Sequence, residues 1–185
     1  MNLNMTNPTP LKIAVLVSGS GSNLQVLIDK QLQQLLNIQI VGVISNKADA
    51  YALERIRLAN EQQANIATAV IERDDNGKKY TRIGFEKQAL QELRAWQPDL
   101  VVLAGFMRIL TPLFIDGVTS STGLNVPMIN LHPSLLPNYK GLDTHTRVLQ
   151  SGERYHGCSV HLVTSELDAG EVNRLGLNLP IKLWL

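Results

Sequence analysis

The sequence of 185 residues predicts a single α/β domain with a mostly parallel sheet and helices on both faces. Six short runs rich in β-branched residues or leucine recur along the chain, and segments with helical periodicity separate most of them. Two of the runs, KIAVLVS at 12–18 and DLVVLAG at 99–105, are apolar at successive positions. Strands covered by helices on both sides have this pattern, so these two belong at the centre of a Rossmann-like sheet.

The remaining elements follow in chain order. The six expected strands are residues 12–18, 38–45, 65–71, 99–105, 128–132 and 158–163. A helix beginning at Ser22 has an apolar stripe made of Leu24, Leu27, Ile28, Leu32 and Leu35. A later helix has a second stripe made of Phe85, Ala89, Leu90, Leu93 and Trp96. Both stripes should face the core, and residues 74–79 (DDNGKK) should form an exposed loop.

Composition narrows the possible partners. The chain has 17 basic and 16 acidic residues, scattered along its length, which disfavours a nucleic acid or a charged membrane as partner. No apolar run approaches the ~20 residues of a membrane span, and the first ten residues lack the pattern of a signal peptide. The single cysteine, Cys158, excludes an intramolecular disulfide and favours a cytoplasmic setting. We interpret it as a small apolar filler in a buried strand.

The loop after the first strand has the features of a phosphate site. In parallel sheets ligands bind at the carboxyl ends of the strands, and here Gly19 to Asn23 (GSGSN) follow a strand and open a helix. A dinucleotide loop would need a glycine in place of Leu24, and the P-loop pattern is missing. We therefore expect Gly21, Ser22 and Asn23 to bind a single phosphate group. The alternative is an ordinary turn in which Ser22 or Asn23 caps the helix.

Asn130 and His132 form a polar pair at the end of the fifth strand. Residues two apart in a strand point to the same face, so the pair would present an amide and an imidazole side by side before Pro133 ends the strand. The chain has no nucleophile elbow, and its four histidines show no metal-ligand spacing, so we expect no metal. The pair suits non-covalent acyl transfer, in which donors stabilise an oxyanion. Otherwise His132 is a core histidine bonded to a backbone carbonyl.

A catalytic histidine needs a carboxylate to orient it. The candidates near a later strand are Glu166, Asp168 and Glu171, and the Ala169–Gly170 turn could bring Asp168 inward. Spacing alone leaves the choice among the three open. His161 has apolar neighbours and is interpreted as structural or as a supporting residue. Met107 and Arg108 could line a binding site or begin the next helix.

Together these motifs resemble the phosphoribosylglycinamide formyltransferases, folate-dependent enzymes of purine synthesis. The resembling segments are SGSGSNLQ, SNKADAYALERIR, PDLVVLAGFMRIL, INLHPSLLP, YKGLDTH, HGCSVHLVT and ELDAG, in order from about Leu11 to Val172. The resemblance implies the formyltransferase fold and transfer of a formyl group from 10-formyltetrahydrofolate, as co-substrate, to the amine of glycinamide ribonucleotide. It implies small-molecule substrates and a monomer or homodimer.

The resemblance also implies roles for individual residues. Asn130 would donate to the formyl oxygen, His132 would stabilise the oxyanion and assist proton movement, and Asp168 would orient His132. The phosphate would bind at Gly21, Ser22 and Asn23. The folate would bind at Arg82, Met107, Arg108, Ile109 and Leu110. Asp143 stands where relatives often carry His or Asn, so the resemblance assigns it no role.

The ends of the chain and two related enzyme classes complete the expectations. We expect a flexible tail at residues 1–10 and a formyltransferase domain at 11–185 that is incomplete at its C-terminus, since relatives continue beyond the LDAG turn. Formyltetrahydrofolate hydrolases share the Asn, His and Asp trio but carry a further N-terminal domain. Methionyl-tRNA formyltransferases append a basic RNA-binding domain. A catalytically impaired phosphate- or folate-binding module is the remaining alternative.

Overall fold

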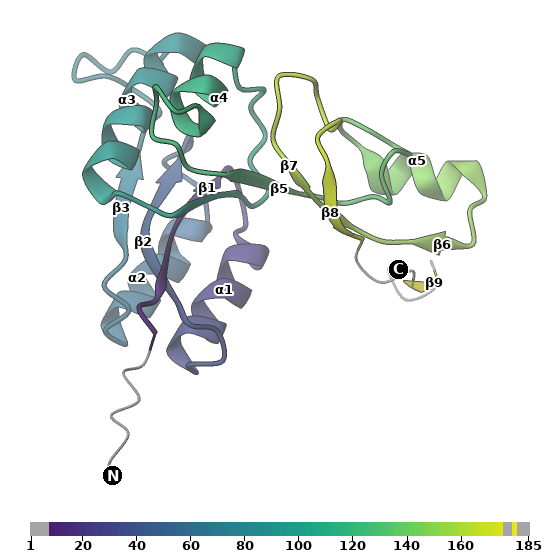
Figure 1. Ribbon diagram of the computed structural model, residues 1–185, viewed down its shortest axis with the longest axis horizontal. Helices are drawn as coiled ribbons and strands as arrows, with labels where there is room; N and C mark the ends of the chain where they lie inside the picture. Colours follow the sequence, from purple (N-terminus) through teal and green to yellow (C-terminus); the bar gives the residue numbers. More distant parts are fainter. Residues whose placement is uncertain (1–7, 176–178, 181–185) are drawn as a thin grey trace.

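The structure is a computed structural model that describes residues 8–175 and 179–180 (Figure 1). Residues 1–7 of the expected tail, and residues 176–178 and 181–185 near the expected incomplete end, lie outside the described residues. Within the residues described, no helix combines the length and the apolar character that crossing a membrane requires.

A seven-stranded sheet in the order β3-β2-β1-β4-β5-β7-β8 forms the frame of the molecule. Its strands are β1 (Leu11–Val17), β2 (Ile38–Ser45), β3 (Ala67–Val70), β4 (Leu100–Leu103), β5 (Met128–His132), β7 (Ser159–Leu162) and β8 (Val172–Leu175). The first five strands pair in parallel, whereas β7 is antiparallel to both of its neighbours. The predicted mostly parallel α/β fold is therefore confirmed, with β1 and β4 at its centre.

Five helices in the described part of the chain accompany the sheet. They are α1 (Ser22–Leu32), α2 (Ala52–Glu61), α3 (Arg82–Trp96), α4 (Pro112–Thr119) and α5 (Thr144–Ser151). A separate pair of short strands, β6 (Tyr155–His156) and β9 (Leu179–Pro180), lies near α5, beyond β7 and β8 (Figure 1). The prediction for Leu35 was wrong: α1 ends at Leu32, Gln34 takes a left-handed φ of 55°, and Leu35 is 59% exposed.

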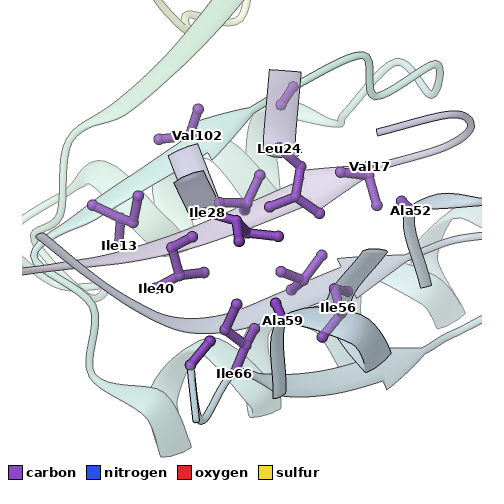
Figure 2. Close-up of a cluster of buried hydrophobic side chains, with 14 of the residues drawn as sticks. Ile13, Val17, Leu24, Ile28, Ile40, Ala52, Ile56, Ala59, Ile66 and Val102 are labelled. Carbon is purple, nitrogen blue, oxygen red and sulfur yellow. The ribbon is translucent and has the colours of Figure 1, made fainter. Parts of the chain in front are cut away.

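Two apolar cores lie on opposite faces of the sheet because β1 is apolar on both faces. Ile13, Val15 and Val17 pack in the core formed with α1 and α2, which includes Leu24 and Ile56 (Figure 2). The alternate residues of β1, Ala14 and Leu16, lie in the second core with Phe85, Ala89 and Phe114 of α3 and α4. The two helical stripes predicted from the sequence therefore face the core, apart from Leu35.

The order of the strands reverses beside β1. This strand lies between β2 and β4, so the loops that follow β1 and β4 leave the sheet at its point of reversal. Open parallel sheets bind their ligands at such a point, at the carboxyl ends of the strands. The loops at 18–21 and 104–111 are therefore placed where a ligand is expected.

Gly170 lets the segment that precedes β8 pass close to the backbone of β7. A Cβ atom at this position would lie 1.9 Å from the carbonyl oxygen of Leu162, which is a backbone atom with little freedom to move. We expect Gly170→Ala to destabilise the protein by about 1–3 kcal/mol, the usual cost of overpacking. Urea unfolding measures the effect. Gly19→Ala is the control, because its Cβ would meet nothing within 4 Å. Equal stability of the two variants would contradict the prediction.

Candidate functional site

The loop after β1 is shaped to leave backbone N–H groups available. Gly21 is the N-cap of α1, with φ 69°, and among the residues that the structure describes no side chain makes a capping hydrogen bond to this helix. The interpretation in which Ser22 or Asn23 caps the helix is therefore wrong. A Cβ at position 21 would lie 2.7 Å from that of Ala52, so glycine is needed both for its conformation and for this contact. Uncapped first-turn N–H groups suit an anion.

Ser18 joins three strand ends at the point of reversal. Its hydroxyl donates to Oδ1 of Asn46, at 2.6 Å, and accepts from the backbone N–H of Met107, at 2.8 Å. Ser18 is 3% exposed. The loop after β1, which is the predicted phosphate loop, is thus tied directly to the loop after β4, which is the predicted folate loop.

The residues predicted to bind folate lie in a loop. Residues 106–110 are not helical, since Thr111 is the N-cap of α4 and accepts from the N–H of Phe114. Met107 and Ile109 are 65% and 59% exposed. The guanidinium of Arg108 lies 4.8 Å above the ring of Phe85, and Leu110 packs against the core. Arg82 is exposed at the start of α3, three residues before Phe85.

Glu86 anchors the end of this loop and was not predicted. Its carboxylate is buried, at 4% exposure, and both of its oxygens accept from Thr111. Oε1 accepts from the backbone N–H at 2.8 Å, and Oε2 accepts from the hydroxyl at 2.6 Å. These bonds fix the point where the loop enters α4. The two residues are 25 positions apart, so no local pattern in the sequence connects them.

The polar pair of β5 lies where the sequence predicts, at the end of the strand. His132 is 4% exposed, and its Nε2 lies 2.9 Å from the carbonyl oxygen of Tyr139. Because a carbonyl can only accept, Nε2 carries a proton and donates it. Asn130 is half-buried, and its Nδ2 lies 3.1 Å from Nε2 of His161.

Asp168 brings the two histidines together. Its Oδ2 lies 3.4 Å from Nδ1 of His132, and its Oδ1 lies 3.4 Å from Nε2 of His161. Asp168 takes a left-handed φ of 48° and is 8% exposed, and Oδ2 also accepts from the backbone N–H of Gly141, at 2.9 Å. The turn that the sequence suggested does carry this carboxylate inward. A carboxylate between two imidazoles can hold and pass a proton.

His161 belongs to the same cluster. The sequence leaves its role open between a structural and a supporting one. It is 2% exposed, and it lies directly opposite Asn130 in the antiparallel pairing of β5 and β7. Its Nδ1 donates to the carbonyl oxygen of Leu162, at 2.9 Å, which leaves Nε2 to face Asn130 and Asp168. The only signal that could have found it is the pairing register, which depends on contacts distant in sequence.

The other acidic candidates lie away from the histidines. The side chain of Glu166 is 80% exposed and lies 4.0 Å from Nζ of Lys140. Glu171 is exposed as well. Asp143 is exposed, has a left-handed φ of 55° and precedes α5 without a capping hydrogen bond from its side chain. The structure therefore brings only one of the three predicted carboxylates, Asp168, to His132.

The remaining two histidines form a separate pair near α5. Nδ1 of His145 lies 2.9 Å from Nε2 of His156. Burial lowers the pKa of His156 below its ordinary value, and the neighbouring His145 lowers it further. Over residues 8–175 and 179–180, no group of three or more His, Cys, Asp or Glu side chains is arranged to hold a metal ion.

Comparison with known proteins identifies the family. The model of the formyl transferase family matches residues 11–174. A phosphoribosylglycinamide formyltransferase of Escherichia coli K12 is 43% identical over 162 residues, which cover 88% of this chain and 70% of the relative. A counterpart of Haemophilus influenzae is 42% identical, over 87% of this chain and 69% of the relative.

Solved structures agree with this result. Glycinamide ribonucleotide transformylase 1 of Symbiobacterium toebii superimposes with a TM-score of 0.77 at 33% identity, covering 95% of this chain and 76% of the other. The phosphoribosylglycinamide formyltransferase of Coxiella burnetii gives a TM-score of 0.71 at 46% identity, covering 88% and 70%. The chain therefore belongs to the formyl transferase family, among its phosphoribosylglycinamide formyltransferases.

Proposed function

We propose that this chain transfers the formyl group of 10-formyltetrahydrofolate to the amine of phosphoribosylglycinamide, in purine biosynthesis, with Asn130, His132 and Asp168 acting on the reacting groups. The observation that carries the proposal is the placement of Asp168, a buried carboxylate 3.4 Å from both His132 and His161, beside Asn130. Of the acyl-transfer arrangements, this one suits attack by an amine that the substrate supplies.

In this reaction the substrate amine attacks the formyl carbon. The carbonyl π electrons move to oxygen and form an oxyanion, after which the bond from carbon to N10 of the folate breaks. The amine loses a proton, and N10 gains one, which yields tetrahydrofolate and the formylated amide. The protein must therefore stabilise a negative oxygen and move one proton.

His132 has the hydrogen-bonding state that this chemistry needs. Its Nε2–H donates to a carbonyl oxygen, that of Tyr139, in the structure. The formyl oxygen of the substrate can replace that carbonyl as the acceptor and accept a stronger bond as its charge develops. Asn130 adds an amide N–H on the same face of β5. Asp168, beside Nδ1, stabilises a proton on the imidazole and so supports proton transfer.

The two substrates would bind at the loops that follow β1 and β4. The uncapped start of α1 would hold the phosphate through N–H groups at Gly21, Ser22 and Asn23. The loop of Met107, Arg108, Ile109 and Leu110 would hold the folate, because Arg108 lies over the ring of Phe85. Arg82, three residues before Phe85, would contribute to the same site. Because Ser18 bonds to both loops, the two binding sites have a fixed relation. Positioning of this kind can supply about 7–11 kcal/mol of the barrier reduction.

A two-substrate assay tests the proposal. Purified protein is incubated with 10-formyltetrahydrofolate, with and without phosphoribosylglycinamide, and release of tetrahydrofolate is followed by absorbance. Release only when both substrates are present supports the proposal. Release without the amine would instead indicate a hydrolase, and binding without release would indicate an inactive binding module.

Glu86→Gln should weaken folate binding without affecting the other substrate. A Gln amide can still accept from the backbone N–H of Thr111, and its NH2 can donate to the Thr111 hydroxyl, but both bonds lose the charge of the carboxylate, which costs about 1–3 kcal/mol. We expect the KM for 10-formyltetrahydrofolate to rise severalfold, with the KM for phosphoribosylglycinamide unchanged. Glu92→Gln, farther along α3, is the matched control. A parallel rise of both KM values would argue against a local effect on the folate loop.

A further inference from the structure

Arg55 lies on α2 but forms its hydrogen bonds with the loop and helix that follow β1. Its Nε donates to the carbonyl oxygen of Ser20, at 2.7 Å, and its Nη1 donates to Oε1 of Gln25, at 3.0 Å. The guanidinium lies 5.0 Å from the centre of the Tyr51 ring. Three contacts therefore fix this side chain, which is only half-buried.

Gln25 is itself held so that it faces Arg55. Its Nε2 donates to Oδ1 of Asp29, one helical turn farther along α1, at 2.8 Å. This bond directs the amide oxygen toward the guanidinium. Both acceptors of Arg55, an amide oxygen and a backbone carbonyl, are neutral. The bonds therefore hold the guanidinium in place without neutralising its charge.

A second contact with α2 holds the same loop. The backbone N–H of Ala52 donates to the carbonyl oxygen of Gly19, at 3.1 Å, and the methyl group of Ala52 leaves no room for a side chain at Gly21. The carbonyl groups of Gly19 and Ser20 are thus both bonded to α2. The N–H groups at the start of α1, which no described side chain caps, remain for a ligand.

We propose that Arg55 is a positioning residue for the phosphate end of the substrate: it holds the Ser20 carbonyl on α2 and adds positive charge beside the Gly21–Asn23 turn. The inference rests on the proposed function, since it assumes that this turn takes the phosphate of phosphoribosylglycinamide. The ligand chemistry it implies is a phosphate monoester dianion. Arg55 acts mainly through the loop, so its removal should affect binding at this end and not the formyl chemistry.

Arg57 provides a matched control on the same helix. It is exposed, and its guanidinium pairs with Glu54 and Glu61 of α2 itself. The acidic neighbours hold its pKa above the ordinary value for arginine. Arg57→Met therefore removes the same charge from the same helix without touching the loop after β1.

Steady-state kinetics with Arg55→Met test the proposal. Loss of two hydrogen bonds from a charged donor should raise the KM for phosphoribosylglycinamide about tenfold or more. The KM for 10-formyltetrahydrofolate and kcat should change less than about twofold. The reason is that Arg55 would support binding of phosphoribosylglycinamide equally in the ground state and in the transition state. Arg55→Lys keeps the charge but lacks the planar fork of donors, so it should restore part of the affinity. Arg57→Met should match the unaltered protein.

Inorganic phosphate supplies a readout that a general loss of stability would not change. It should inhibit competitively against phosphoribosylglycinamide, and its inhibition constant should rise in Arg55→Met by the same factor as the KM. Unchanged constants, or an equal rise in the KM of both substrates, would overturn the inference. Should Arg55→Met not fold, Gln25→Leu removes one anchor of Arg55 and should give a smaller rise in the same two constants.

Calorimetric titration with inorganic phosphate separates this inference from the proposed function. Absence of formyl transfer by the unaltered protein would count against the proposed function alone. Equal phosphate affinity in the unaltered protein and in Arg55→Met would count against the role of Arg55, whether or not transfer occurs.

Discussion

Asp168→Asn is expected to lower turnover by about 10²- to 10⁴-fold, the range that a positioned acid or base contributes. The carboxylate faces Nδ1 of His132 and Nε2 of His161, each at 3.4 Å, and it is the only one of the three acidic candidates that is buried. An amide keeps the shape of the side chain, and its oxygen can still accept from the N–H of Gly141. It cannot stabilise a proton on either imidazole, so catalysis is lost while the fold is kept.

Two controls make this prediction specific. Glu166→Gln removes a carboxylate only two positions earlier, from a side chain that is 80% exposed, and should leave turnover within about twofold, as surface changes usually do. Thermal unfolding monitored by circular dichroism shows whether Asp168→Asn is folded. Near-normal turnover in a folded Asp168→Asn protein would remove Asp168 from the mechanism, and a loss equal to that of Glu166→Gln would point to a general effect of charge.

Local pattern was enough to predict the frame of the molecule. The apolar runs of β1 and β4 predicted strands with helices packed on both faces, and both strands lie at the centre of the sheet. Period-two alternation placed Asn130 and His132 together at the end of β5, because that spacing is a property of any strand. The prediction that Leu35 faces the core was wrong because the apolar periodicity continues past the end of α1. The left-handed backbone of Gln34 marks that end.

The partners of the polar pair could not be predicted in the same way. Selecting Asp168 from three carboxylates depends on its left-handed backbone and on the bond to Gly141, which is 27 residues away. His161 joins the cluster through the register of β5 against β7, and Glu86 joins the predicted folate loop through Thr111. Each of these contacts links segments distant in sequence, and no local spacing encodes it. Recognition of the family motifs supplied Asp168, but it supplied neither Glu86 nor Arg55.

The second large effect is expected for Asn130→Ala, which should lower kcat by about 10²- to 10³-fold with little change in either KM, as loss of one oxyanion donor does. The amide of Asn130 bonds to Nε2 of His161 in the structure, so two explanations of such a loss must be separated. Asn130 either donates to the developing oxyanion itself or merely holds His161 in place.

A double-mutant cycle with His161→Gln separates the two roles of Asn130. If Asn130 donates to the oxyanion, its removal should cost about the same factor in the His161→Gln background as in the unaltered protein, since independent effects add. If Asn130 acts only through His161, with which it pairs across the two strands, the double variant should be no slower than His161→Gln alone. We expect the first result, because the half-buried amide carries a second N–H that the contact with His161 does not use.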